Sequence, residues 1–188
     1  ADLVDVDAPI ENTLPSAAKF ASRMQALGLG DGSRIVIYDD SAVKSSARAW
    51  FMLRLFGAQN VALLDGGIAK WKAEGRPLAG GEKKKRRRPY TTWSDESQLR
   101  SKAQVLANIE SKAEQVVDAR GKPRFTGADP ELRPGLASGH IPCSLNVPFA
   151  TLFKPDGAWK DPAELRSVFT AAGVDLSRPI VPSCGSGV

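Results

Sequence analysis

The sequence predicts an α/β fold made of two tandem units, each an open parallel sheet flanked by helices. Apolar strand segments alternate with helical segments along the 188 residues, an order typical of parallel sheets. A gapless offset of 145 residues also superposes Gly28 on Gly173 and Asp39 on Cys184. The length suits one large domain or two small ones, since domains commonly run to about 100–150 residues. We therefore expect one unit twice, a catalytic half that ends in a cysteine and a degenerate copy that ends in an aspartate.

The composition excludes several classes of protein. Hydrophobic residues make up 42% of the chain and charged residues 25%, a globular balance that excludes wholesale disorder and collagen-like structure. No apolar run approaches the roughly 18 residues of a membrane span, and the N-terminal segment lacks the basic-then-apolar order of a signal peptide. Two cysteines and one histidine are too few for a disulfide scaffold or a Cys/His zinc site. We expect a soluble protein of a reducing compartment, the cytoplasm or, in a eukaryote, the mitochondrion, with no metal.

The net charge of +5 comes from one segment of the chain. Glu82–Arg88 holds six basic residues and one acidic residue, so the remaining sequence is neutral. A nucleic-acid binder spreads its basic residues over a face, whereas this run is contiguous. We interpret 81–93 as a solvated linker between domains at 1–80 and 94–188, with a polyanion-binding or targeting segment as the alternative. We expect no nucleic-acid partner and no membrane partner.

Apolar periodicity and turn residues define the elements of the first domain. In chain order they are a strand at 33–39, a helix that runs to Phe56, a strand at 60–64, a turn at 65–67 and a short helix that starts at 68. Ser41 is the expected N-cap of the first of these helices, and Gly57 ends it.

The second domain repeats this alternation after the basic run. Its expected elements are a helix at 94–111, a strand at 115–118, a long Gly/Pro/Arg loop at 121–139, a short strand at 146–147, a helix from Pro162 to Ala172 and a strand at 179–181. Pro162 suits the first turn of its helix because the missing N–H is not needed there.

Cys184 is the strongest candidate for chemistry. It follows an apolar strand and opens the segment Gly185-Ser186-Gly187. Ligands collect at the carboxyl ends of parallel strands, and glycines let successive backbone N–H groups converge on an anion. Such a loop would stabilise a thiolate and make the cysteine a nucleophile. A buried structural cysteine is the alternative, because unpaired cysteine is among the most buried residue types.

Several motifs, in this order and spacing, resemble the rhodanese superfamily, in particular the tandem-domain 3-mercaptopyruvate sulfurtransferases. In the second half they are the segments 118–120, 124–125, 131–135, 139–142 and 184–188, and in the first half 36–39, 48–50, 64–67 and Trp71. The resemblance implies tandem rhodanese-like domains, the first noncatalytic and the second catalytic. It also implies that the first domain lacks its opening strand and helix and that the second is incomplete, ending at the active-site loop.

The resemblance implies an enzyme that moves sulfur from 3-mercaptopyruvate to Cys184 as a persulfide and releases pyruvate. A thiol, thioredoxin or cyanide would then accept the sulfur, and no cofactor is implied. Arg124 and Arg133 would bind the substrate carboxylate, for which planar guanidinium groups are suited. Ser186 would assist catalysis by donating a hydrogen bond to the departing enolate or to the sulfur. The remaining loop residues implied to contact the substrate are Gly185, Gly187 and Val188.

Asp7 matches the aspartate of a Ser/His/Asp relay that would run through Ser186. Relatives carry a histidine shortly before a Leu-Pro pair, whereas Asn12 and Thr13 precede Leu14-Pro15 in this chain. The relay is therefore expected to be incomplete or absent.

Other readings of the same residues remain open. A thiosulfate:cyanide sulfurtransferase would share the fold, but thiosulfate-preferring relatives place basic residues in the loop that is uncharged here at 185–188. A noncatalytic rhodanese-like binding module is a second alternative. A cysteine-dependent phosphatase is a third, and its arginine, six residues after the cysteine, would fall beyond Val188.

The remaining candidates are expected to be structural. His140 lies in a turn that enters a strand, and Asp118 is expected to fix the backbone or pair with a nearby arginine. Cys143 is interpreted as an incidental small residue where relatives usually have glycine, with a redox partner for Cys184 as the alternative.

Overall fold

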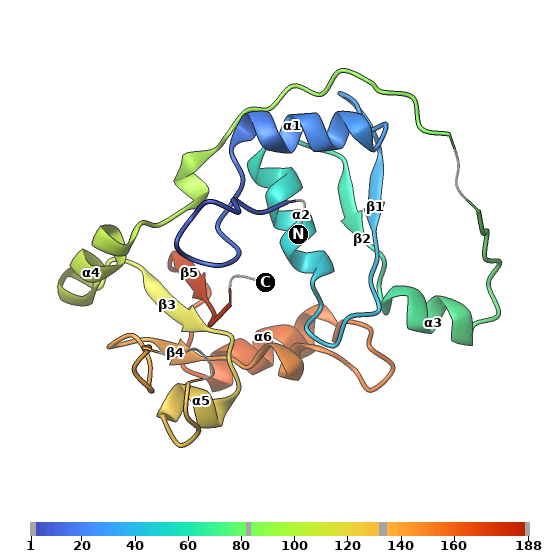
Figure 1. The fold of residues 1–188 in the computed structure, drawn as a ribbon. Coiled ribbons are helices and arrows are strands. Elements are labelled where there is room, and N and C mark those ends of the chain that lie inside the picture. The colour runs from blue at the N-terminus through green and yellow to red at the C-terminus, as the bar shows by residue number, and fades with distance from the viewer. Residues whose placement is uncertain (1–2, 82–83, 132–134, 187–188) are drawn as a thin grey trace. The chain divides into compact units, whose positions relative to one another are not determined.

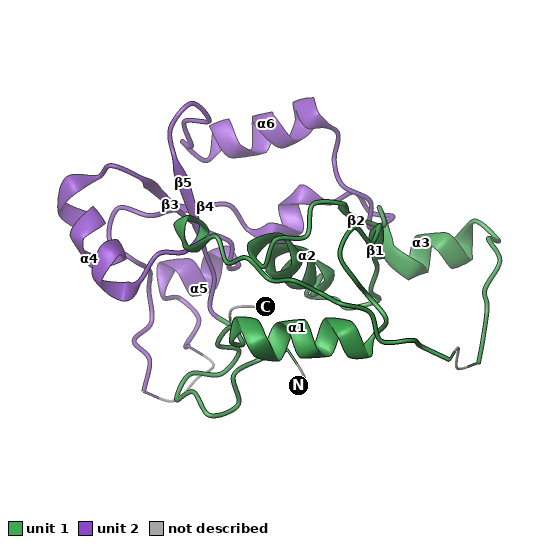
Figure 2. Ribbon diagram, turned by 90° about the horizontal axis from the view of Figure 1, so that it is seen from above, with its two compact units in different colours: residues 1–98, 186–188 green, residues 99–185 purple. Residues whose placement is uncertain are grey.

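The computed structural model describes residues 3–81, 84–131 and 135–186. The chain divides into two compact units, one of residues 1–98 with 186–188 and one of residues 99–185 (Figures 1 and 2). Both contain parallel strands and helices, which confirms the predicted α/β class. The predicted domains at 1–80 and 94–188, with a linker at 81–93, were defined by the sequence repeat. The two compact units are defined by contacts within the structure, so the predicted boundaries stay a prediction.

The first unit is built around a pair of parallel strands. Its elements are α1 (Ala17–Ala26), β1 (Ile35–Ile37), α2 (Ser46–Leu55), β2 (Val61–Leu63), α3 (Gly67–Ala73) and the 3-10 turn η1 (Glu96–Gln98). β1 pairs with β2 in parallel, with Ile35 opposite Val61. Phe20 of α1 is fully buried, and its ring stacks on Phe56 and meets the edge of Tyr90. Burying these three aromatic rings together fixes α1 against the end of α2.

The second unit holds a parallel sheet of three strands in the order β4-β3-β5, visible side by side in Figure 1. Its elements are α4 (Lys102–Ser111), β3 (Gln115–Asp118), α5 (Lys122–Thr126), β4 (Leu145–Asn146), the 3-10 turn η2 (Phe149–Leu152), α6 (Pro162–Ala171) and β5 (Ile180–Ser183). Asp118 pairs with Asn146 on one side and with Ser183 on the other. The carboxyl ends of all three strands therefore meet at one edge of the sheet, and Cys184 is the next residue after β5.

The predicted repeat is confirmed down to individual hydrogen bonds. Helices α1 and α6 cover the same ten positions at the offset of 145, and each is capped by a side chain, Ser16 or Asp161, that accepts from the third helical N–H. Each helix is followed by a left-handed glycine, Gly28 at φ 78° and Gly173 at φ 83°. Glycine is favoured there because a Cβ is strained at positive φ.

The start of one predicted helix was wrong. The segment 94–111 forms the turn η1 and then α4, which begins only at Lys102. Ser101 accepts from the backbone N–H of Gln104, and the Gln104 side chain accepts from the backbone N–H of Ser101, a reciprocal capping box that marks the true start of the helix.

Two further local predictions were also wrong. The loop predicted at 121–139 contains the short helix α5, which carries a proline in its first turn. Ser41 does not cap α2, because its hydroxyl instead accepts the backbone N–H of Val43. The N-cap residue is Ser45, whose side chain makes no capping hydrogen bond. The first N–H of the helix, that of Ser46, instead donates to Asp39 Oδ2 at 2.6 Å, and the Ser45 hydroxyl donates to the same oxygen at 3.3 Å. No helix among the described residues is long and apolar enough to cross a membrane.

Candidate active site

Cys184 lies at the carboxyl edge of the β4-β3-β5 sheet. The Ala119 N–H donates to the Ser183 carbonyl at 2.8 Å, so the end of β3 is held beside the residue that precedes the cysteine. Cys184 is exposed and takes part in no disulfide within the described chain. The alternative of a buried structural cysteine is therefore wrong, and the thiol is accessible to a substrate.

Gly185 is the point of closest approach between the cysteine loop and two arginines. A Cβ added to Gly185 would lie 2.5 Å from Arg124 Nη2 and 3.1 Å from Arg120 Cδ. Real Cβ atoms do not approach so closely, so any other residue at position 185 would require the end of the Arg124 side chain to shift. The structure thus brings Arg124, a predicted substrate-binding residue, next to the neighbour of Cys184.

The two arginines belong to a largely buried network of four charged side chains. Arg120 donates from Nε and Nη2 to the Asp118 carboxylate, at 2.7–3.1 Å, and from Nη1 to Glu131 Oε2 at 3.2 Å. Glu131 Oε1 accepts from Arg124 Nη2 at 2.5 Å. The carboxylates of Asp118 and Glu131 are only 5% and 6% exposed. Two positive and two negative groups share this space, and pairing offsets much of the cost of burying them.

The network also holds Arg120 firmly in its charged form. Hydrogen bonding to Asp118, and next the charges of Asp118 and Glu131, raise the pKa of Arg120 above its ordinary value, against the opposing effect of burial. Arg120 Nη2 additionally donates to the Gly139 carbonyl at 2.7 Å. The expectation that Asp118 pairs with a nearby arginine is confirmed.

The other predicted site residues lie partly outside this cluster. Arg133, Gly187 and Val188 lie outside the described residues. Within the first unit, the Ser186 carbonyl accepts from Asn12 Nδ2 at 2.9 Å. Asp7 is exposed and its backbone N–H donates to Asp5 Oδ1. No hydrogen bond among the described residues joins the Asp7 carboxylate to Ser186, and the role of Asp7 in a relay stays an untested hypothesis.

His140 has a local structural environment in the second unit. Its ring stacks on Phe125 with centroids 3.8 Å apart, and Nδ1 lies 2.7 Å from the Phe125 carbonyl oxygen. These contacts join the turn before β4 to helix α5, which supports the structural interpretation of His140.

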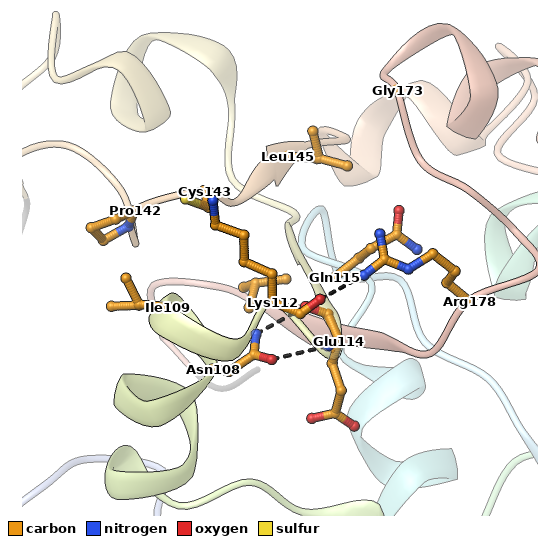
Figure 3. A pocket seen from close by; sticks show the side chains of 11 residues that line it. Asn108, Ile109, Lys112, Glu114, Gln115, Pro142, Cys143, Leu145, Gly173 and Arg178 are labelled. Carbon is orange, nitrogen blue, oxygen red and sulfur yellow. Dashed lines mark hydrogen bonds between the residues drawn. The ribbon is translucent and has the colours of Figure 1, made fainter.

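Cys143 lies at the opposite edge of the same sheet. It precedes β4, whereas Cys184 follows β5, and both strands run parallel to β3. Cys143 lies in a turn at φ 65°, at the end of the sheet where the strands begin, whereas Cys184 lies where they end. This placement argues against a disulfide between them, which needs Cα atoms within about 7 Å. Cys143 instead lines a separate cavity of about 230 Å³ with Lys112, Arg178 and other residues (Figure 3).

Two roles escaped the sequence analysis. Asp39 was predicted only as the repeat partner of Cys184, but its carboxylate accepts the first N–H of α2. The first unit therefore has a hydrogen-bonded carboxylate at the position where the second unit has a thiol. Glu131 was noticed only as part of a motif, although it joins both site arginines. The signal for Asp39 was a carboxylate at a strand end shortly before a helix. No comparable local signal marks Glu131.

Comparison with known proteins defines the class to which this fold and site belong. The family profile of the rhodanese-like domain matches residues 5–74. The crystal structure of Escherichia coli SseA, described among the 3-mercaptopyruvate sulfotransferases, matches with a TM-score of 0.89 and 34% identity, covering 99% of this chain and 69% of that one. The chain belongs to the rhodanese family.

Two groups of sulfurtransferases are about equally similar to this chain in sequence. The 3-mercaptopyruvate sulfurtransferase of Mus musculus is 39% identical over 186 residues, and the thiosulfate sulfurtransferase of Cricetulus griseus is 38% identical over 187 residues. Each alignment covers 98% of this chain and 63% of the relative. The chain therefore spans less than two thirds of the length of these curated relatives.

Proposed function

We propose that the protein is a 3-mercaptopyruvate sulfurtransferase with Cys184 as its sulfur carrier. The observation that carries the proposal is an exposed thiol at the carboxyl edge of a parallel sheet, one residue from a glycine against which the Arg124 guanidinium lies. The names of the mouse relative and of SseA support the same activity. The reaction needs no cofactor, because the cysteine itself holds the transferred sulfur.

The proposed reaction has two steps. The Cys184 thiolate attacks the sulfur of 3-mercaptopyruvate, the sulfur–carbon bond breaks, and its electron pair leaves on carbon as the pyruvate enolate. The enolate takes up a proton to give pyruvate, and the transferred sulfur remains on Cys184 as a persulfide. An acceptor thiolate or cyanide then attacks the outer sulfur, which returns Cys184 to its thiolate. Ser186 is proposed to donate a hydrogen bond to the enolate.

The proposed donor follows from the charges around Cys184. The carboxylate of 3-mercaptopyruvate suits Arg124, and we keep Arg133 as its proposed second donor. The loop after Cys184 carries no charged side chain, which does not favour a dianion such as thiosulfate. From the resemblance, we also propose that Gly185, Gly187 and Val188 contact the substrate. A thiosulfate sulfurtransferase is the second candidate, because the hamster relative of that name is almost as similar as the mouse enzyme.

The proposed sulfur acceptor is a small thiol, thioredoxin or cyanide. An exposed cysteine accepts attack by a macromolecular thiol as well as by a small one. We propose the cytoplasm as the location, since a reducing environment keeps Cys184 available as a thiol.

The deciding experiment measures pyruvate release from 3-mercaptopyruvate together with the mass of cysteine-containing peptides. The whole protein should release pyruvate and carry one added sulfur on the peptide that contains Cys184. Cys184→Ser should abolish both signals, whereas Cys143→Ser, the matched control, should preserve them.

Three results would overturn the proposal in different ways. Added sulfur found only on Cys143 would reject the assignment of the carrier. Faster turnover of thiosulfate than of 3-mercaptopyruvate would favour the second candidate. The absence of any persulfide with either donor would favour a noncatalytic module.

A further inference from the structure

We propose that Glu131 is a positioning residue for sulfur transfer, which aims Arg124 at the donor carboxylate beside Cys184. The inference rests on the proposed function, since it assigns Arg124 to the carboxylate of the donor. Glu131 itself is expected to touch neither the substrate nor the reacting sulfur. Its role is to hold one side of the Arg124 guanidinium so that the other side is left for the substrate.

Glu131 joins Arg124 to Arg120, which is held at the carboxyl end of the sheet by Asp118. Its Oε2 accepts from Arg120 Nη1 at 3.2 Å and its Oε1 accepts from Arg124 Nη2 at 2.5 Å. Arg120 is in turn held by Asp118, at the carboxyl end of β3. A continuous series of ion pairs therefore runs from the sheet edge to Arg124, and Glu131 is its only bridge between the two arginines among the described residues.

Burial makes this bridge rigid. The Glu131 side chain is 6% exposed and Arg120 is 11% exposed, whereas Arg124 at the end of the series is 26% exposed. Charge-assisted hydrogen bonds that are shielded from water are short and strong, so the carboxylate restricts the guanidinium to a small range of positions. Arg124 is thus held by a buried carboxylate, while about a quarter of its own side chain stays exposed.

Arg124 keeps donors in reserve for a ligand. Its Nε is buried, yet among the described residues it has no hydrogen-bond partner. An unsatisfied buried donor is costly, and in native proteins it requires an explanation such as an absent ligand. The same guanidinium lies against Gly185, next to Cys184. The atom nearest to Gly185 is Nη2, which carries two N–H groups and donates one of them to Glu131. A carboxylate bound beside Gly185 would accept from the other N–H and bring the rest of a small substrate to the thiol.

The charge balance of the network agrees with this division of roles. Asp118 and Glu131 neutralise Arg120 and Arg124, so the bound substrate adds one further negative charge. Because both oxygens of Glu131 accept from arginines, glutamine cannot replace it. A side-chain amide offers one accepting oxygen and one donating nitrogen, and the nitrogen would face an arginine N–H.

The test separates loading of Cys184 from delivery of its sulfur. Glu131→Gln should raise the KM for 3-mercaptopyruvate and lower persulfide formation from it by about tenfold or more, as expected when a charged hydrogen bond is lost. Loading by inorganic polysulfide, a donor that lacks a carboxylate, should stay within about twofold of the unmodified protein. Transfer from the loaded persulfide to cyanide should change equally little. Glu110→Gln, the same change at an exposed position on α4, is the matched control.

A double-mutant cycle shows whether Glu131 acts through Arg124. In an Arg124→Gln background, Glu131→Gln should cause little further loss with 3-mercaptopyruvate, because the group that it positions is gone. Glu131→Asp, which keeps the charge, should recover part of the KM. Equal losses with polysulfide and 3-mercaptopyruvate, or fully additive effects of the two substitutions, would overturn the positioning role. If the unmodified protein accepts sulfur from polysulfide but not from 3-mercaptopyruvate, the proposed function fails instead.

Discussion

Gly185 determines, at the scale of one residue, how near Arg124, the proposed substrate-binding arginine, comes to Cys184, the proposed nucleophile. Arg124 Nη2 would meet a Cβ at this position at 2.5 Å, and it cannot move aside freely because the same nitrogen donates to Glu131. Gly185→Ala should therefore displace Arg124, raise the KM for 3-mercaptopyruvate and slow persulfide formation by about tenfold, while the fold is retained. Steady-state kinetics and a thermal melt measure the two effects.

Gly80→Ala is a suitable comparison for this substitution. Gly80 has open space around its Cα and no left-handed backbone, so an added methyl group meets nothing. Its sulfur transfer should match that of the unmodified protein. Normal kinetics for Gly185→Ala would mean that Arg124 has another position from which it serves the substrate equally well.

Asp39 determines where the second helix of the first unit begins. Its carboxylate accepts the Ser46 N–H, one of the groups that a helix leaves without an internal partner. Asp39→Ala should lower the free energy of unfolding by about 1 kcal/mol, comparable to the loss of an N-cap side chain, because the Ser46 N–H loses its acceptor. Urea unfolding followed by circular dichroism measures this change, and Asp40→Ala, on the exposed neighbour, should have little effect. A similar loss for both variants would show that this hydrogen bond contributes nothing.

The basic segment at 84–88 forms neither a helix nor a strand. Residues 84–88 are all exposed, and Arg87 donates to Gln25 at the end of α1. Replacing Lys84, Arg86 and Arg87 with glutamine should leave sulfur transfer within about threefold, because surface changes are usually small. It should also remove any salt-sensitive retention on a polyanion column. A loss of activity beyond tenfold would show that the segment steers the anionic donor or supports the site.

The elements differ in how well the sequence predicts them, and the reason is the range of the interactions involved. Helix α6 was predicted almost to its exact bounds, because the proline in its first turn and the glycine that follows it are signals within a few residues. The bounds of its copy α1 were not predicted. The helix predicted at 94–111 was wrong at its start, since the capping box at Ser101 begins the helix and the segment 94–101 carries only one apolar residue, Leu99. Cys184 was predicted from its strand and glycines. The ion pairs of Glu131 were not predicted, because they join it to arginines 7 and 11 residues earlier in the chain, and no local sequence pattern marks such pairs.

At the scale of the whole molecule, hydrogen-bonded carboxylates in both units make stability depend on pH. Asp31 accepts from the backbone and the hydroxyl of Thr91 in the first unit, and these bonds lower its pKa below the ordinary 3.8. In the second unit the backbone N–H of Glu164 lowers the pKa of Asp161, the N-cap of α6, in the same way. In both cases the folded protein binds a proton less readily than the unfolded chain does.

The sign of the pH effect follows from these lowered values. A carboxyl group with a lowered pKa in the folded state contributes its full stabilisation above its unfolded pKa and loses it as the pH falls through the folded value. We therefore expect the free energy of unfolding to decrease below about pH 4. Asp31→Asn and Asp161→Asn keep a hydrogen-bond acceptor without the titrating group. Each should therefore lower the free energy of unfolding at neutral pH and make its decrease between about pH 5 and pH 3 less steep. Urea unfolding from pH 7 to pH 3 measures this, and a decrease as steep in the double variant as in the unmodified protein would assign the loss to other carboxylates.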